Sequence, residues 1–197
     1  MVRPRCDAPG PNAAERLIDA FWEMLARMPY GSITISGISR EAKVSPNTLY
    51  YHFDGILDIA QTAIASELSD EVADAIVDQT EKKGIVLARL LGDPRNATRA
   101  ERIRLVAASG SSQLTSMLVD MLKQKWCALA GIAPGELSFE EELDLDFIYG
   151  GVVVVLASYR TKGGFETLVR FFDRPLGEGI VATMTNLEAH RKSERQN

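Results

Sequence analysis

The chain has 197 residues, of which 46% are hydrophobic and 25% are charged, and its formal net charge at pH 7 is -5. These proportions are ordinary for a soluble globular protein, and they exclude a collagen, a low-complexity chain and a disordered acidic chain. The two cysteines, Cys6 and Cys127, are too few for a disulfide framework or a multi-ligand zinc site. Free thiols in a reducing cytosol are therefore expected.

The N-terminus lacks the apolar core and the cleavage pattern of a signal peptide. The longest nearly apolar run, residues 148–158, is shorter than the roughly 20 residues that a membrane span needs. We therefore expect a soluble cytoplasmic protein with no membrane partner. No nucleophile elbow, P-loop or dinucleotide fingerprint occurs, which predicts that the chain is not an enzyme and binds no cofactor. The acidic run 140–146 is interpreted as a solvated first helical turn rather than a metal site.

Helical periodicity dominates the chain and predicts an all-α fold. Residues 1–11, rich in Pro and Gly, are expected to form a flexible leader. Asn12 precedes Glu15 by three residues, which predicts a capping box at the start of a first helix. Pro29 and the residues after it are expected to end that helix.

Two short helices are predicted next. Thr34 is expected to cap the first of them, and Ser45 the second, with Pro46 in its first turn. Leu49 and Phe53 lie four residues apart and are expected to point inward. A short helix, a tight turn and a second short helix form the layout of a helix-turn-helix.

Apolar residues at helical spacing continue to the C-terminus, interrupted by glycines and prolines. A capping box at Thr98 and Glu101 is predicted to open one of these helices. The other predicted helices cover residues 56–81, 85–91, 114–129, 138–162, 165–172 and 176–190.

The helix predicted over 138–162 contains four consecutive valines, 152–155, which favour a strand by residue type. We still predict a helix, because Ser138 and Glu141 form a capping box and no partner strand is visible. A helix that is apolar nearly all round is expected to be buried on two sides, one against the core and the other against a second subunit.

The second short helix, residues 46–53, carries an exposed polar row that suits DNA. Asn and Thr side chains can meet base edges or thymine methyl groups, whereas Tyr and His suit phosphate oxygens. The row consists of Asn47, Thr48, Tyr50, Tyr51 and His52.

At these residues the sequence resembles the TetR family of transcriptional regulators. That family has Thr and an apolar residue at the start of helix 2, Ala before a tight turn, Val-Ser, and then Thr-Leu-Tyr-Tyr-His-Phe. The corresponding residues here are Thr34-Ile35, Ala42, Val44-Ser45 and Thr48-Leu49-Tyr50-Tyr51-His52-Phe53. The motif resemblance covers roughly residues 12–65, and the rest agrees in helix count, length and order.

The resemblance implies an N-terminal three-helix DNA-binding domain over 12–58 and a C-terminal helical ligand-binding and dimerisation domain over 59–197. It implies a repressor that a small-molecule effector releases from a palindromic operator in double-stranded DNA. The homodimer would form through the helices near 138–162 and 176–190. The DNA-binding residues would be Thr34, Lys43, Ser45, Asn47, Thr48, Tyr50, Tyr51 and His52.

Three positions depart from the family pattern. Lys43 stands where the family usually has Gly in the turn, and Gly37 lies inside helix 2. Ile56 replaces the Lys that usually begins helix 4, and residues 1–60 carry six Lys or Arg against seven Asp or Glu. A DNA-binding domain normally has a basic surface, so we expect weak nonspecific binding and a shallow salt dependence. The alternative is a ligand- or protein-binding module that kept this fold and lost DNA binding.

Aromatic and methionine residues gather in the C-terminal half, where they indicate either a mostly apolar effector pocket or ordinary core packing. The predicted ligand-binding residues are Ser109, Gln113, Met117, Met121, Trp126, Phe147 and Tyr149.

Overall fold

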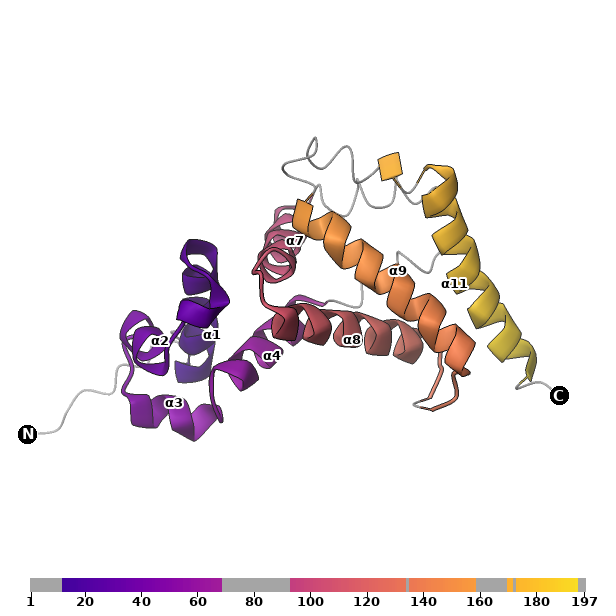
Figure 1. Cartoon of the computed structure of the whole chain (residues 1–197). Helices are drawn as coiled ribbons and strands as arrows, with labels where there is room; N and C mark the ends of the chain where they lie inside the picture. Colours follow the sequence, from indigo (N-terminus) through magenta and orange to yellow (C-terminus); the bar gives the residue numbers. More distant parts are fainter. Residues whose placement is uncertain (1–11, 69–92, 134, 159–169, 172, 195–197) are drawn as a thin grey trace, which may run out of the picture. The chain divides into compact units, whose positions relative to one another are not determined.

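The computed structural model describes residues 12–68, 93–133, 135–158, 170–171 and 173–194 (Figure 1). Within these ranges the regular structure is helical, as predicted, and the four valines lie in a helix. The chain divides into two compact units, the first of which ends at Ala63. No helix of the described ranges is long and apolar enough to cross a membrane.

The first unit contains three helices that pack on one another in pairs, and the beginning of a fourth. The three are α1 (Ala13–Arg27), α2 (Ile35–Glu41) and α3 (Pro46–His52), and the fourth is α4 (Ile56–Glu67). A short 3-10 helix, η1 (Tyr30–Ser32), lies between α1 and α2. The end that was predicted for α4, at residue 81, lies outside the described residues.

The predicted capping box opens α1. The Glu15 N–H donates to Asn12 Oδ1 at 2.9 Å, and the Asn12 N–H donates back to Glu15 Oε2 at 3.0 Å. Leu17 and Phe21 follow on the buried face and are fully enclosed. Local capping and the apolar stripe therefore agree on where this helix begins and which way it faces.

The close packing around Gly37 explains why α2 contains a glycine in its interior. A side-chain Cβ at this position would lie 2.9 Å from Met24 Cε and 3.0 Å from Thr34 Oγ1. The Thr34 hydroxyl is needed there, because it caps α2 by accepting from the Gly37 N–H at 3.1 Å. Glycine thus lets α2 pack closely on α1 at a helix-propensity cost of about 1 kcal/mol.

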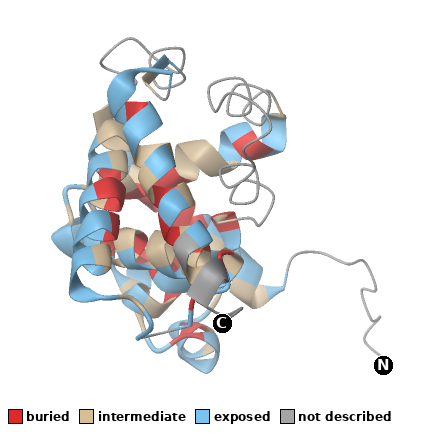
Figure 2. Cartoon of the chain, turned by 90° about the vertical axis from the view of Figure 1, so that its right-hand side faces the viewer, coloured by how far each residue is buried: buried red, intermediate tan, exposed pale blue. Residues whose placement is uncertain are grey.

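The second unit contains α7 (Pro94–Ala107), α8 (Ser112–Leu129), α9 (Phe139–Ser158) and α11 (Pro175–Glu194). Helix α9 packs against each of the other three. The helices predicted over 85–91 and 165–172 fall outside the described residues, apart from 170 and 171. In Figure 2 each helix combines buried and exposed residues along its length, so that its faces differ.

The predicted start of a helix at Thr98 is wrong, because α7 begins one turn earlier. Asp93 caps it by accepting from the Arg95 N–H at 2.8 Å, and Pro94 occupies its first position. The Thr98 hydroxyl instead donates to the Pro94 carbonyl oxygen at 3.0 Å, while Glu101 pairs with Arg104. An Asp-Pro pair is a stronger start signal than a Thr one turn later, since Pro cannot continue a helix from its N-terminal side.

The capping box predicted at α9 is present. The Ser138 N–H donates to Glu141 Oε2 at 2.7 Å, and the Glu141 N–H donates to Ser138 Oγ at 3.3 Å. The valine run is buried on one side only in the single chain, because Val153 is 1% exposed and Val154 is 64% exposed. The second side of this run is therefore not covered by the described residues.

The buried cluster of the second unit joins α8, α9 and α11. It contains Trp126, Ala130, Ile132, Leu145, Ile148, Tyr149, Met184 and Leu187. Two ion pairs hold the helices around it, Lys123 with Asp146 between α8 and α9, and Arg191 with Glu141 between α11 and α9.

Glu141 makes the stability of this unit depend on pH. The hydrogen bond from the Ser138 N–H, together with the Arg191 guanidinium, lowers the pKa of Glu141 below its ordinary value. A carboxyl group whose pKa is lowered by folding contributes stability above its unfolded pKa and loses it as pH falls through the folded pKa. Acidification below the ordinary Glu range is therefore expected to weaken the α9–α11 contact.

Glu141→Gln is expected to lower the free energy of unfolding at pH 7 by up to about 1 kcal/mol, since it removes the charge but keeps a capping side chain. Urea unfolding followed by circular dichroism at pH 7 and pH 3 measures this. The difference between the variant and the wild type should shrink in acid. An unchanged difference at both pH values would contradict the role of the carboxylate.

Candidate nucleic-acid interface

The turn between α2 and α3 has a well-defined hydrogen-bonding pattern. The Val44 N–H donates to the Ser39 carbonyl oxygen at 2.9 Å, and the Lys43 N–H donates to the Arg40 carbonyl oxygen at 3.2 Å. This is the Schellman motif, in which the residue after the helix takes the left-handed conformation. Lys43 takes that conformation, with φ at 55°. Lys43 therefore takes the left-handed conformation at the position where the TetR family usually has glycine.

Lys43→Gly is expected to raise the free energy of unfolding of the first unit by about 0.5–1 kcal/mol. The substitution removes the left-handed penalty of about 1–2 kcal/mol but adds the unfolded-state entropy of glycine. Thermal unfolding compared with Lys43→Ala, which removes the charge and keeps the strain, measures the effect. Equal stability of the two variants would exclude strain at this turn.

Helix α3 begins with a serine cap. Ser45 Oγ accepts from the Thr48 N–H at 3.1 Å and lies 2.9 Å from Thr48 Oγ1, and Pro46 follows at the first helical position. The hydroxyl groups of Ser45 and Thr48 are therefore partners of each other. Their spacing, N-cap to third helical residue, is visible in the sequence and is a signal for a mutual cap. Thr48 is half-buried, so it is less exposed than the sequence predicts for the polar row of this helix.

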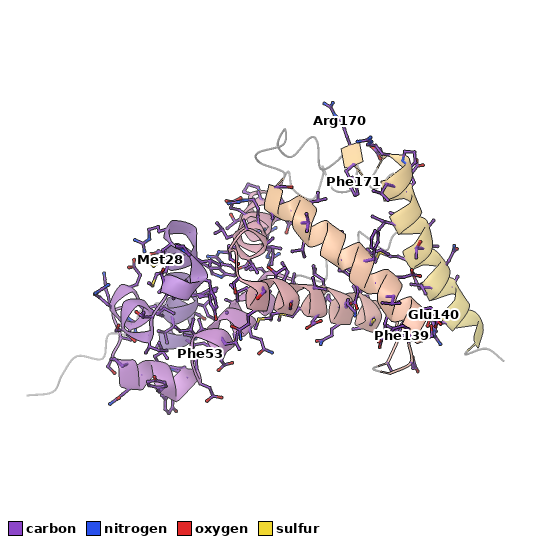
Figure 3. All side chains as sticks on the ribbon, viewed as in Figure 1. Met28, Phe53, Phe139, Glu140, Arg170 and Phe171 are labelled. Carbon is purple, nitrogen blue, oxygen red and sulfur yellow. The ribbon has the colours of Figure 1, made fainter. Side chains whose placement is uncertain are left out.

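The outer face of α3 exposes aromatic side chains while its inner face is anchored in the unit. Tyr51 is 84% exposed and Tyr50 is 59% exposed, whereas Leu49 is fully buried. Phe53, labelled in Figure 3 just after the end of α3, is 7% exposed. The Tyr51 and His52 rings meet edge to face, with their centroids 5.0 Å apart.

Asn47 and His52 are exposed on the same helix, as the sequence predicts. The structure therefore brings Asn47, Tyr50, Tyr51 and His52 together on one short helix that two buried residues hold in place. Thr34, by contrast, is occupied as the cap of α2. The row offers amide, phenol and imidazole groups, which are side chains that contact bases and phosphates.

The positive charge of this unit is small. Arg27 pairs with Glu41 at 2.9 Å, which leaves its charge largely compensated. Among the described residues, Arg40 and Lys43 are exposed and take part in no ion pair, and both adjoin the turn before α3. Lysine and arginine side chains exposed in this way are the groups that bind phosphate in nucleic-acid interfaces.

Ile56 is half-buried at the start of α4, where the resembling family has a lysine. Asp58 has a structural role beside it, since its Oδ2 accepts from the Asp54 N–H at 3.0 Å. The carboxylate therefore serves the start of the helix in addition to adding negative charge. Asp58 is one of the seven acidic residues counted in 1–60, and its position in the first turn of α4 is typical of a residue that stabilises a helix start.

The predicted ligand-binding residues do not all come together. Trp126 and Tyr149 belong to the buried cluster of the second unit, and Met117 and Met121 are half-buried on α8. Phe147 is 78% exposed and lies on the opposite side of α9 from the cluster. Ser109 and Gln113 lie around the start of α8, where Ser109 Oγ accepts from the Ser111 N–H at 3.2 Å and Gln113 is exposed.

Burial raises the pKa of Tyr149, and the neighbouring Cys127 adds to the effect. The pKa of the Cys127 thiol is raised by burial as well. Both groups therefore stay neutral at pH 7, and Cys127 is a free thiol, as predicted. Cys127 was not among the predicted ligand-binding residues, although it follows Trp126 directly in the sequence.

Comparison with known proteins identifies the first unit. Residues 17–62 match the family model of bacterial regulatory proteins of the tetR family. A search of curated proteins found no matching sequence.

Three solved structures align with more than 90% of this chain. The fatty acid degradation regulator FadR from Bacillus halodurans has a TM-score of 0.51 at 16% identity, over 92% of this chain and 96% of that chain. The TetR family repressor AlkX from Dietzia sp. strain DQ12-45-1b has a TM-score of 0.44 at 15% identity, over 91% of this chain and 97% of that chain. The dihydroxyacetone kinase operon activator DhaS has a TM-score of 0.40 at 12% identity, over 91% of this chain and 95% of that chain.

The likeness to FadR shows a common fold, and the family model covers the helix-turn-helix and the start of α4. The matched family consists of regulatory proteins rather than enzymes, in agreement with the sequence. Residues 17–62 thus form a helix-turn-helix domain of the kind found in bacterial regulatory proteins of the tetR family.

Proposed function

We propose that the chain is a transcriptional repressor of the cytoplasm that binds a palindromic operator through α3. The observation that carries this proposal is the exposed row on α3, in which Tyr51 is 84% exposed while Leu49 is fully buried beneath it. Tyr50 and Tyr51 are adjacent and both exposed, and exposed aromatic groups gathered on one surface are typical of a binding site. Asn47 supplies a group that can read adenine, and Tyr50, Tyr51 and His52 supply contacts to the backbone.

The other predicted DNA-binding residues support the interface in different ways. Lys43 and Arg40 are proposed to contact phosphates, because both are exposed beside the turn. Ser45, Thr48 and Thr34 are proposed to act mainly as caps that fix the orientation of α2 and α3, with any phosphate contact secondary.

A palindromic operator requires two recognition helices about 34–36 Å apart, so the active species is proposed to be a homodimer. The exposed apolar residues of the second unit support a contact through α9 and α11. They are Phe139, Leu143, Phe147 and Val154 on α9, and Leu176 on α11.

A small-molecule effector is proposed to bind between the helices of the second unit and to favour a state that no longer fits the operator. Such coupling requires that the effector bind one state better than the other. The residues proposed to line the site are Ser109, Gln113, Met117, Met121, Trp126 and Tyr149. Phe147 is left out, because it is 78% exposed on the far side of α9.

Intrinsic fluorescence tests the effector site, because the chain has only two tryptophans. In a Trp22→Phe variant, Trp126 becomes the single reporter. An apolar compound that releases DNA is expected to change the Trp126 emission. Release without any change in emission would place the effector away from Trp126.

DNA binding is tested by selecting bound duplexes from a random library at low and at moderate salt, with Tyr51→Ala as the control. An enriched palindrome that the variant fails to bind is the expected result. A titration of the selected duplex against salt should give a shallow slope, because few cations adjoin α3. A steep slope with many ions released would contradict that expectation.

The second candidate is a ligand- or protein-binding module that has this fold but no longer binds DNA. Ile56 in place of lysine, with Asp54 and Asp58 beside it, favours this candidate. No enrichment at either salt concentration, in a sample shown to be a folded dimer, would establish it over the repressor.

A further inference from the structure

The residue types on the exposed side of α3 limit which base pairs this helix can read. The exposed residues of the helix are Pro46, Asn47, Tyr50, Tyr51 and His52. Guanine is read most often by arginine or lysine, which donate to its O6 and N7 atoms, and cytosine by aspartate or glutamate, which accept from its N4 group. None of these four residue types occurs in α3. The helix therefore lacks the side chains that most often specify a G·C pair.

Asn47 carries the carboxamide on the exposed side of α3. This group can accept a hydrogen bond from the N6 amino group of adenine and donate one to adenine N7 at the same time. Among the described residues, the Asn47 side chain has no hydrogen-bond partner, so its donor and its acceptor are both available. Asn47 is the second residue of α3, and the second helix of a helix-turn-helix contacts base edges with its N-terminal residues.

Thr48 adds an apolar group to the same turn of the helix. Its hydroxyl lies 2.9 Å from Ser45 Oγ, and its N–H donates to that oxygen at 3.1 Å. The polar atoms of Thr48 are thereby engaged in the helix start, and the methyl group is the part of the side chain that has no such role. Pro46, two residues earlier, is apolar and exposed. In the major groove, apolar side chains recognise the C5 methyl group of thymine.

The cations near α3 precede its first residue in the chain. Arg40 lies in the last turn of α2, and Lys43 lies in the left-handed turn that follows. When a helix-turn-helix binds DNA, its first helix crosses the phosphate backbone while its second enters the major groove. In the proposed complex Arg40 and Lys43 would therefore contact phosphates, which carry no sequence information. His52 is the last residue of α3 and thus also lies outside its N-terminal turn.

We infer that the first turn of α3 reads adenine–thymine pairs, with Asn47 hydrogen-bonded to an adenine and the Thr48 methyl group against a thymine methyl group. The inference rests on the proposed repressor and adds the base pairs that its operator must contain. Each half-site has A·T pairs where the first turn of α3 enters the groove. Specificity then comes from one amide and from apolar contacts, without a charged side chain that touches a base.

Replacement of single base atoms tests the adenine contact. In the operator selected from the random library, 7-deaza-adenine replaces adenine at one A·T pair of each half-site at a time, which removes the N7 acceptor and keeps base pairing. We expect one position at which the wild type binds about five- to tenfold more weakly, measured by fluorescence anisotropy. Asn47→Ala should bind the normal and the substituted operator equally, because the variant has already lost the contact.

Gln61→Ala, which removes an exposed amide from α4, is the matched control for Asn47→Ala. This control should remain as sensitive to 7-deaza-adenine as the wild type. If Asn47→Ala kept the full sensitivity as well, Asn47 would not be the residue that reads adenine, and the inference would be overturned.

Deoxyuridine in place of thymidine tests the apolar contact, since deoxyuridine lacks only the C5 methyl group. At one position of each half-site, the wild type should bind the substituted operator about fourfold more weakly. Thr48→Ser keeps the hydroxyl that pairs with Ser45 and removes the methyl group. It should therefore be insensitive to the same replacement. A Thr48→Ser variant with the sensitivity of the wild type would overturn the thymine contact.

The outcomes separate this inference from the proposed function. If the library yields no operator, the proposed repressor fails, and the inference fails with it. If the library yields an operator in which 7-deaza-guanine weakens binding and 7-deaza-adenine does not, the chain binds DNA but the inference is overturned. Loss of that guanine sensitivity in Arg40→Ala would then place the reading group on α2. Sensitivity to 7-deaza-adenine that disappears in Asn47→Ala is the result that supports the inference.

Discussion

Phe147→Glu is expected to convert the dimer into monomers and to abolish operator binding at the concentrations where the wild type binds. Phe147 is 78% exposed in the single chain, so its replacement leaves the core of the second unit untouched. In a two-fold interface the change occurs twice, and each copy buries a carboxylate without a partner. Since a central aromatic residue typically contributes 2 kcal/mol or more, the dissociation constant of the dimer should rise by at least about 100-fold.

Analytical ultracentrifugation and operator binding by fluorescence anisotropy measure the two effects together. Gln124→Glu, which adds one carboxylate at an exposed position of α8, is the matched control and should behave as the wild type. If Phe147→Glu stayed dimeric with full operator affinity, the dimer would have to form through another surface.

Tyr51→Ala is expected to weaken binding to the selected operator by about 10- to 100-fold, which corresponds to about 1–3 kcal/mol. The side chain is 84% exposed and its ring meets the His52 ring, which is also exposed, so its loss is expected to change the binding surface and not the fold. Tyr51→Phe keeps the ring and removes the hydroxyl group. It therefore separates a phosphate hydrogen bond from an apolar contact.

Asn47→Ala tests base reading in the same assay. If Asn47 contacts a base edge, the variant should lose discrimination between the operator and a scrambled duplex, whereas Lys43→Ala should weaken both duplexes equally. Anisotropy titrations with the two duplexes at one salt concentration measure the difference. If Tyr51→Ala and Asn47→Ala both bound the operator like the wild type, α3 would not be the helix that enters the major groove of the DNA.

The helix starts that sequence predicted correctly depend on side chains that cap their own helix. Asn12 with Glu15, and Ser138 with Glu141, form the reciprocal hydrogen bonds that their spacing indicates. Such bonds join residues three apart, so their formation depends on local sequence and little else. The helix start predicted at Thr98 was wrong because Asp93 and Pro94, one turn earlier, form a better local cap.

The left-handed turn at Lys43 illustrates a mixed case. The residues on either side of Lys43 indicate a turn. Lysine itself is unfavourable there, since it is rare at a positive φ. Packing of α2 and α3 against α1 imposes the conformation and outweighs the local cost.

The sequence by itself determined the all-α class, the helix-turn-helix of residues 34–53 and its polar row, because short-range caps and the helical period are encoded in neighbouring residues. Only the tertiary structure decided which side of an almost uniformly apolar helix is buried. Along α9 the sequence offers hydrophobic residues nearly all round, so no period distinguishes Phe147 from Tyr149. Contacts with α8 and α11, distant in sequence, bury Tyr149 and leave Phe147 at 78% exposure. The same long-range packing places Met24 beside Gly37, whereas none of the described residues lies within 4 Å of a Cβ at Gly150 or Gly151.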